Sequence, residues 1–332
     1  MRPLTMTKYL VKKLGGWLAI IFIATNITFF LATAFLDPKS NYVGRRPPLP
    51  EDQIQRTLQP LNLSDNTPLF ERWWTWLSNI LFHWDWGESP LGESVNQQIS
   101  FRIWVSAELL LLATVLSVII GVAIGVYTAS NQYKMGDRIW QGISIVTMNL
   151  HIVVASIITV AFGLWVNRIT GSRIFYVTGA SKYGVHGFFP TLLDFLQHVA
   201  LPTFSLLLVN YAGYHMMQRS LLLDNLNADY VRTARAKGLP RRKAIRKHAL
   251  RTSIIPVATS VAFSIPGIFT GAIMTEKIFA WQGMGDYFIT ALSHNDIYGT
   301  VAVAAFGAFT TAVAAILADI TVVILDPRVR VS

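Results

Sequence analysis

Residues 229–256 read DYVRTARAKGLPRRKAIRKHALRTSIIP, a stretch with nine lysine and arginine residues and a single aspartate. Apolar segments lie on both sides of it, and Gly-Leu-Pro at 238–240 interrupts its middle. Lysine and arginine are concentrated in the loops on one side of a membrane protein. We therefore interpret this stretch as a loop between two membrane-spanning helices.

The composition supports a membrane protein. Of the 332 residues, 52% are hydrophobic and only 14% are charged, whereas soluble domains carry about a quarter charged residues. The chain has no cysteine, which excludes disulfides and thiolate metal sites. The net charge of +10 lies in short segments between apolar runs. Because the sequence shows no aromatic and basic platform or groove-binding motif, nucleic acid is not an expected partner.

Six apolar runs are long enough to cross a bilayer core of about 30 Å. The first is longer than a signal-peptide core and lacks a clear cleavage site, so we expect it to be retained. The six expected spans are Leu14–Phe35, Trp104–Tyr127, Ile139–Val166, Val199–Met217, Ile254–Ile273 and Tyr298–Leu325.

The charge distribution gives an orientation. Eighteen of the 28 lysine and arginine residues fall before the first span, after the last, or in the loops after the second and fourth. The positive-inside rule places that side in the cytoplasm, with both termini.

The segment after the first span is then external. It is proline-rich early (DPKSNYVGRRPPLP, 37–50) and tryptophan-rich later (RWWTWLSNILFHWDWGESPLGESV, 72–95). Short helices with an interfacial aromatic belt are favoured there over a substrate cage.

The expected organisation follows from these spans. The expected divisions are a cytoplasmic N-terminus with the first span (1–35), an external segment (36–103), a core of five spans (104–325) and a cytoplasmic tail (326–332). The basic loop occupies about 219–253 of the core.

Two short helices are expected in the basic loop. Asn227 or Asp229 can cap the first, which is rich in alanine and ends at Gly238. Pro240 suits the first turn of the second. The small residues Ala234, Ala236 and Gly238 would let a partner surface approach closely, and the cations suit a polar docking groove or anionic lipid headgroups. A role in topology alone is the alternative.

Polar residues within the spans have two interpretations. Asn210 and His215 are candidates for a translocation lining, but helix-to-helix hydrogen bonds are the more common use of such residues. Pro266 and Gly267 would bend the fifth span, as a hinge or as a packing kink. Asp319 is the one carboxylate well inside an expected span. An ion-coupled carrier would need a tighter carboxylate cluster there.

No catalytic residues are assigned. The sequence lacks the GxxxxGK[ST] phosphate loop and the HExxH metal motif, and its histidines are not at convincing ligand spacing. We therefore expect no metal site and no cofactor in this chain.

The basic loop resembles the EAA loop of bacterial ABC importer permeases, in the form found in the peptide/nickel branch and most similar to the B-type subunits of oligopeptide permeases. Arg232, Thr233 and Ala234 stand where the general motif has Glu-Ala-Ala. Four other stretches also resemble that family: TKYLVKKLGGWLAIIFIATNITFFL (7–31), HWDWGES (83–89), GAIMTEKIFAWQGMGDYFITAL (271–292) and ILADITVVILDPRVR (316–330). In the third of these, Gln282 stands where many members have proline.

The resemblance implies a fold and a mechanism. It implies six transmembrane helices of the type I ABC importer fold in the bacterial cytoplasmic membrane. Its implied partners are a second permease, two ATPase subunits or domains that hold ATP and Mg²⁺, and an external solute-binding protein that delivers peptides. The residues it implies for ATPase coupling are Asp229, Arg232, Thr233, Ala234, Arg235, Ala236, Lys237, Gly238 and Leu239.

Other functions remain open at this point. The same machinery could import nickel, an oligosaccharide or an antimicrobial peptide. An ion-coupled carrier would work without an ATPase partner, and a membrane enzyme would need an acid–base pair or metal cluster that the sequence does not show.

Overall fold

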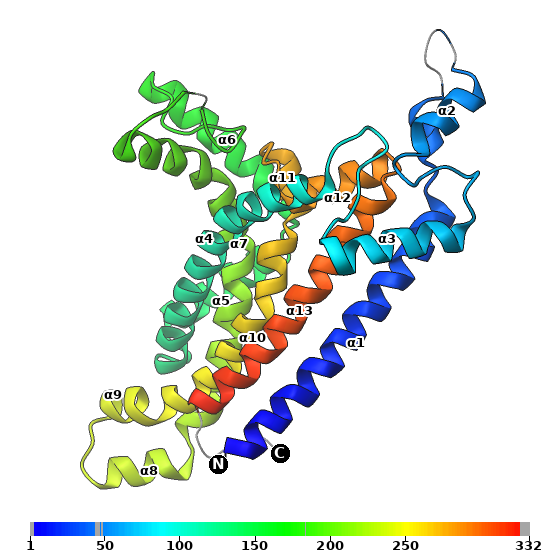
Figure 1. Cartoon of the computed structure of the whole chain (residues 1–332). Coiled ribbons are helices and arrows are strands. Elements are labelled where there is room, and N and C mark those ends of the chain that lie inside the picture. Colours follow the sequence, from blue (N-terminus) through cyan, green and yellow to red (C-terminus); the bar gives the residue numbers. More distant parts are fainter. Residues whose placement is uncertain (1–2, 44–46, 48, 183, 326–332) are drawn as a thin grey trace. The chain divides into compact units, whose positions relative to one another are not determined.

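The structure, a computed structural model, describes residues 3–43, 47, 49–182 and 184–325. These residues form helices and no named strand (Figure 1). The elements are α1 (Pro3–Phe35), η1 (Pro38–Asn41), α2 (Glu51–Leu58), α3 (Leu69–His83), α4 (Val95–Ser130), α5 (Met135–Met148), α6 (Ile152–Thr170), α7 (Phe188–Leu226), α8 (Asp229–Ala236), α9 (Arg241–Ala244), the π-helical turn η2 (Ile245–Ala249), α10 (Leu250–Thr270), α11 (Ile273–Ile278), α12 (Met284–Ser293) and α13 (Ile297–Leu325).

Six helical segments in the described part of the chain are long and apolar enough to cross a membrane, which confirms the expected all-α membrane fold. They are Lys12–Phe35, Val95–Ser130, Ile152–Thr170, Phe188–Leu226, Arg241–Ile278 and Ile297–Ile324. Most are longer than expected; α4, for example, begins at Val95 rather than near Trp104. Apolar runs locate the lipid-facing part of a helix but not its polar end turns.

The third expected span, Ile139–Val166, is two helices in the structure. Helix α5 ends at Met148, and α6 begins at Ile152. His151 is the N-cap of α6, and its Nδ1 accepts a hydrogen bond from the Val153 N–H at 3.3 Å. Apolar residues flank the break on both sides and no glycine or proline marks it, so averaged hydropathy did not reveal it.

Some expectations lie outside the described residues. These are the cytoplasmic tail 326–332 with Arg328 and Arg330, together with Arg2, Arg45 and Arg46 of the charge count.

The chain divides into two compact units. Unit 1 comprises Met1–Ser106, Phe269–Ile273 and Gln282–Ala312, and unit 2 comprises Ala107–Ile268, Met274–Trp281 and Val313–Ser332.

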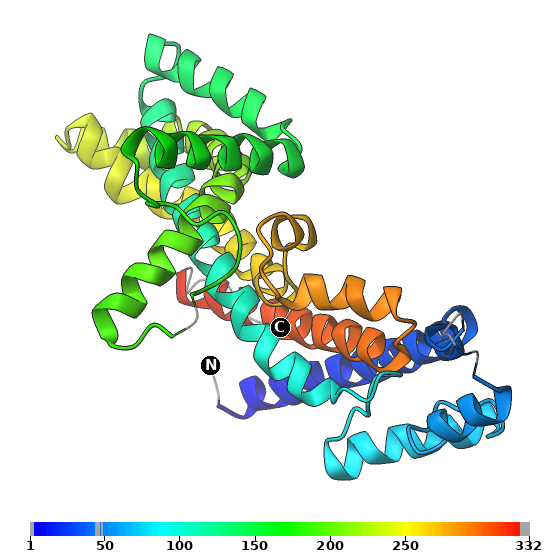
Figure 2. The same ribbon diagram turned by 90° about the horizontal axis from the view of Figure 1, so that it is seen from above.

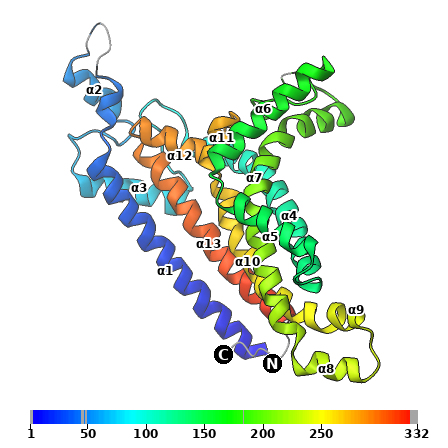
Figure 3. The same ribbon diagram turned by 180° about the vertical axis from the view of Figure 1, so that it is seen from behind.

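In unit 1, the segment 36–103 packs on α1 and on the start of α13. Trp76 of α3 is 2% exposed and stacks on Phe29 of α1, with ring centroids 4.5 Å apart. Figure 3 shows α3 crossing the last turns of α1. In contrast, Trp74 and Trp84 are exposed. A second cluster joins α12 to α13 through Met284, Tyr287 and Val303, and Figure 2 shows these two helices side by side.

In unit 2, α7 packs against α5 and α6. Helix α4 also approaches α7 closely, because glycines face the α7 backbone. A Cβ at Gly121 would lie 2.6 Å from the Tyr211 carbonyl oxygen, and one at Gly125 would lie 2.9 Å from that of His215. Glycine four residues apart is the pattern that lets two membrane helices approach this closely.

Candidate functional site: the basic loop and the helix ends that carry it

The first helix of the basic loop, α8, ends in a well-formed cap. The Leu239 N–H donates to the Ala234 carbonyl at 3.2 Å, and the Gly238 N–H donates to the Arg235 carbonyl at 2.9 Å. This pair of bonds is the Schellman motif, which needs a residue with positive φ after the C-cap. Gly238 supplies it with φ +88°. The sequence therefore located this helix end correctly.

The helix starts differ from expectation. Ala228 is the N-cap of α8, and no side chain caps it; Asp229 is the first helical residue and Asn227 lies before the cap. Pro240 is the N-cap of α9 rather than a residue of its first turn. Helix α9 continues through η2 into α10, so the second short helix is the start of a continuous helix to the end of α10.

The basic loop is seated on a small apolar core, which we call the loop core. Its buried residues come from α4, α7, α8, α9 and η2 and are Ala129, Leu222, Val231, Ala244, Ile245 and Ala249. The half-buried residues packed around them are Val126, Leu223, Leu226 and Leu239. Figure 1 shows α8 and α9 at the adjoining ends of α7 and α10. The loop core fixes α8 to the ends of the long helices.

The nine expected coupling residues divide between the interior and the surface of the chain. Ala234 is 8% exposed and Leu239 is half-buried, so both face inward. The other seven are exposed: Asp229, Arg232, Thr233, Arg235, Ala236, Lys237 and Gly238. A Cβ at Gly238 would meet nothing within 4 Å. The outer face of α8 is therefore open to a partner and rich in cations.

A buried polar cluster joins α4, α5 and α7 beside the loop core. His215 is fully buried, with Nε2 3.1 Å from the Thr128 hydroxyl and Nδ1 2.6 Å from the Ser144 hydroxyl. His215 therefore lies in a packed helix interface.

An ion pair lies one turn further along α7. Arg219 donates from Nε to Asp137 Oδ1 at 2.8 Å and from a terminal nitrogen to Oδ2 at 3.0 Å. The Tyr133 N–H and the Gln141 amide also donate to this carboxylate. The Arg219 hydrogen bonds are the main cause that holds the pKa of Asp137 below its usual range. The pair fixes α5 to α7.

A side-chain hydrogen bond also joins α10 to α7. Gln218 donates to the Ser253 hydroxyl at 2.9 Å in a buried contact. Asn210 is exposed on α7, and Gly267 is exposed near the end of α10. Pro266 and Gly267 lie just before the boundary between the units at Ile268. The structure does not gather Asn210, His215, Pro266 and Gly267 into one site.

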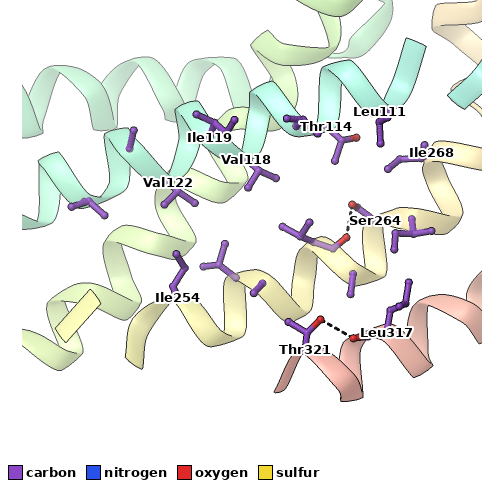
Figure 4. Close-up of a pocket in the computed structure, with 18 of the residues that line it drawn as sticks. Leu111, Thr114, Val118, Ile119, Val122, Ile254, Ser264, Ile268, Leu317 and Thr321 are labelled. Carbon is purple, nitrogen blue, oxygen red and sulfur yellow. Dashed lines mark hydrogen bonds between the residues drawn. The ribbon is translucent and has the colours of Figure 1, made fainter. Parts of the chain in front are cut away.

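An apolar groove of about 940 Å³ lies in unit 2 between α4, α10 and the last part of α13. Figure 4 shows Val118 and Val122 of α4 pointing toward α10, whose Ile254 lines the same space. Within the described residues, no group of three metal-binding side chains is placed to hold a metal ion.

The sequence did not predict two contacts of this region, the ion pair of Asp137 with Arg219 and the hydrogen bond of Gln218 with Ser253. Sequence reasoning also missed the α4 glycines, although their GxxxG spacing, at Gly121 and Gly125, was a usable signal.

The six long apolar helices of the described residues define an all-α integral membrane protein. Residues 121–331 match the family described as the binding-protein-dependent transport system inner membrane component. The chain belongs to this family.

Similar proteins span the whole chain. The oligopeptide transport system permease protein OppB of Mycobacterium tuberculosis is 35% identical over 328 residues, which cover 98% of this chain and all of the relative. The oligopeptide transport system permease protein AppB of Bacillus subtilis and the dipeptide transport system permease protein DppB of Lactococcus lactis are each 27% identical, again over 98% of this chain and all of the relative.

Proposed function

We propose that this chain is the membrane-spanning permease subunit of an ABC importer that carries peptides, with oligopeptides as the first candidate. The observation that carries this proposal is the full-length similarity to oligopeptide and dipeptide permeases. An external solute-binding protein delivers the peptide, and a second permease completes the passage. ATP is hydrolysed with Mg²⁺ on two separate ATPase subunits or domains, so this chain itself is not a catalyst and carries no cofactor.

The basic loop faces the cytoplasm of a bacterial cell in this proposal, as do both ends of the chain. Its exposed cations support that orientation, because such residues are enriched on the cytoplasmic side. The outer face of α8 contacts the ATPase subunits. The main contact falls within Thr233–Leu239, through the exposed residues Thr233, Arg235, Ala236, Lys237 and Gly238.

Movement of the ATPase subunits reaches the spans through the loop core. Val231 packs α8 against residues at the ends of α4 and α7. Because η2 continues into α10, a displacement of α8 also acts on α10. Coupling of this kind needs a structural element whose conformation responds both to the ATPase subunits and to the translocation pathway. Pro266 and Gly267 are the candidate hinge of α10, and Asn210 is a candidate lining residue.

The test changes the cap of α8. Gly238→Val forces a β-branched residue into a positive φ, whereas Gly238→Asn suits that conformation better. Because the added Cβ meets nothing within 4 Å, neither change collides with the rest of the chain. In the assembled complex with binding protein, we expect peptide uptake and stimulated ATP hydrolysis to fall strongly in Gly238→Val and less in Gly238→Asn. Full activity of both variants would contradict the coupling role.

A further inference from the structure

Three cations surround a hollow beside the basic loop. Lys243, Arg246 and Lys247 are exposed, and with Leu239 they line a space of about 440 Å³. Among the described residues, no carboxylate lies within ion-pair distance of these three side chains. Clustered like charges without a counter-ion raise the local concentration of anions. The hollow therefore suits a ligand with a negatively charged group.

The apolar groove of unit 2 suits a different kind of group. Its walls are almost entirely aliphatic, as Figure 4 shows for Leu111, Val118 and Ile268. The Ser264 and Thr321 hydroxyls on these walls donate to carbonyls of their own helices. The groove offers burial to hydrocarbon.

The basic hollow and the apolar groove adjoin the same part of unit 2. Val126 lines the groove and packs on the loop core, while Leu239 lines the hollow and packs on that same core. Leu250, a groove residue, follows Lys247 by one turn of the continuous helix. The cations thus lie toward one end of a hydrocarbon-lined groove.

We propose that this composite site binds an anionic phospholipid. Its phosphate contacts Lys243, Arg246 and Lys247, and its acyl chains lie along Leu250 and Ile254 in the groove. An acidic protein surface would neutralise the cations but leave the groove empty. An apolar helix would fill the groove but leave the cations without a counter-ion. An anionic amphiphile satisfies both, since basic residues next to a membrane attract acidic lipid headgroups. The proposal does not depend on which solute the permease carries.

The test uses the full-length chain with its co-purifying subunits in phosphatidylcholine nanodiscs. One set contains phosphatidylglycerol with a photoreactive acyl chain, and a matched set contains phosphatidylcholine with the same chain. After illumination, labelled peptides are mapped by mass spectrometry. We expect label within 111–126 and 250–268, at least several-fold stronger for phosphatidylglycerol.

Matched variants separate the site from general charge. The triple change Lys243→Gln, Arg246→Gln and Lys247→Gln should remove the preference for phosphatidylglycerol. The control triple change Arg241→Gln, Arg242→Gln and Arg251→Gln removes the same charge from exposed residues of the same segment that do not line the hollow, and should keep the preference. Ala258→Phe, which narrows the groove, should reduce labelling without any change of charge.

Three results would overturn the proposal. The first is equal labelling by both lipids in the unmutated protein, which needs no variant to fold. The second is equal loss of preference in the two triple variants. The third is groove residues that cross-link to a helix of another subunit while no lipid is retained.

Discussion

Asp296 lies directly before α13 in unit 1 and is only 2% exposed. Its Oδ1 accepts the Gly299 N–H at 2.9 Å. Gly299 is needed at that position, because a Cβ there would collide with the Asp296 carboxylate and the Tyr287 hydroxyl. Burial raises the pKa of Asp296 to about 6, although backbone N–H groups of Gly299 and Tyr298 oppose the shift. The folded protein therefore holds this proton at a pH where the unfolded chain releases it.

This proton gives a pH-dependent contribution to stability. Between about pH 4 and pH 6 the unfolded chain loses a proton that the folded protein keeps, so stability falls as the pH rises through that window. The shift corresponds to roughly 3 kcal/mol. Asp296→Asn keeps an acceptor for Gly299 without the charge. We expect its melting temperature to exceed that of the unmutated protein by more at pH 7.5 than at pH 4.5. A difference that does not change with pH would contradict this assignment.

Asp137 illustrates the opposite case. Its side chain is 1% exposed, and Arg219 holds its pKa below the usual range, so its contribution is present at neutral pH and is lost as the pH falls through that lowered pKa. Asp137→Asn leaves the Arg219 cation without its partner and is expected to cost about 3 kcal/mol. Asp224 is exposed on α7, so Asp224→Asn is the matched control and should leave the stability nearly unchanged.

A double variant tests whether the loss comes from the unpaired cation. Adding Arg219→Gln to Asp137→Asn removes that cation and should recover part of the melting temperature. If the double variant is as unstable as the sum of the two single variants, the ion pair does not account for the loss.

At the scale of elements, the approach of α4 to α7 depends on missing side chains. In Gly125→Ala the new Cβ would lie 2.8 Å from the Gln218 Cβ and 2.9 Å from the His215 carbonyl oxygen. We expect the two helices to separate, at a cost of about 1–3 kcal/mol. Gly213→Ala on α7 meets nothing within 4 Å and should be neutral or slightly stabilising. Thermal melting in detergent compares them, and equal effects would show that the close contact is not stabilising.

Local signals predicted the elements better than the contacts between them. Gly238 marked the end of α8 because the Schellman cap is encoded within a few residues. The break between α5 and α6 contains no glycine or proline, and the apolar residues on both sides of it concealed the polar Asn149 and His151. The cluster of Thr128, Ser144 and His215 brings together residues from three helices. Sequence spacing within one helix carries no information about contacts between three helices.

At the scale of the whole molecule, hydropathy and charge were sufficient for the fold class. Burial of backbone polar groups in lipid restricts a chain of this composition to helices, so six apolar runs indicate six spans. Of the nine expected coupling residues, seven are exposed on or next to α8, whereas Ala234 and Leu239 face inward. The role of these residues in ATPase contact stays a prediction. The groove arises from the packing of α4, α10 and α13, which no single segment encodes.

The most direct test of the central claim is solute uptake by the reconstituted complex. The chain is affinity-purified in mild detergent from its native membrane with the subunits that accompany it, and is placed in liposomes with the external binding protein. We expect accumulation of labelled oligopeptide only with hydrolysable ATP, and no effect of a proton ionophore. Uptake by this chain alone, driven by an ion gradient without ATP, would contradict the account.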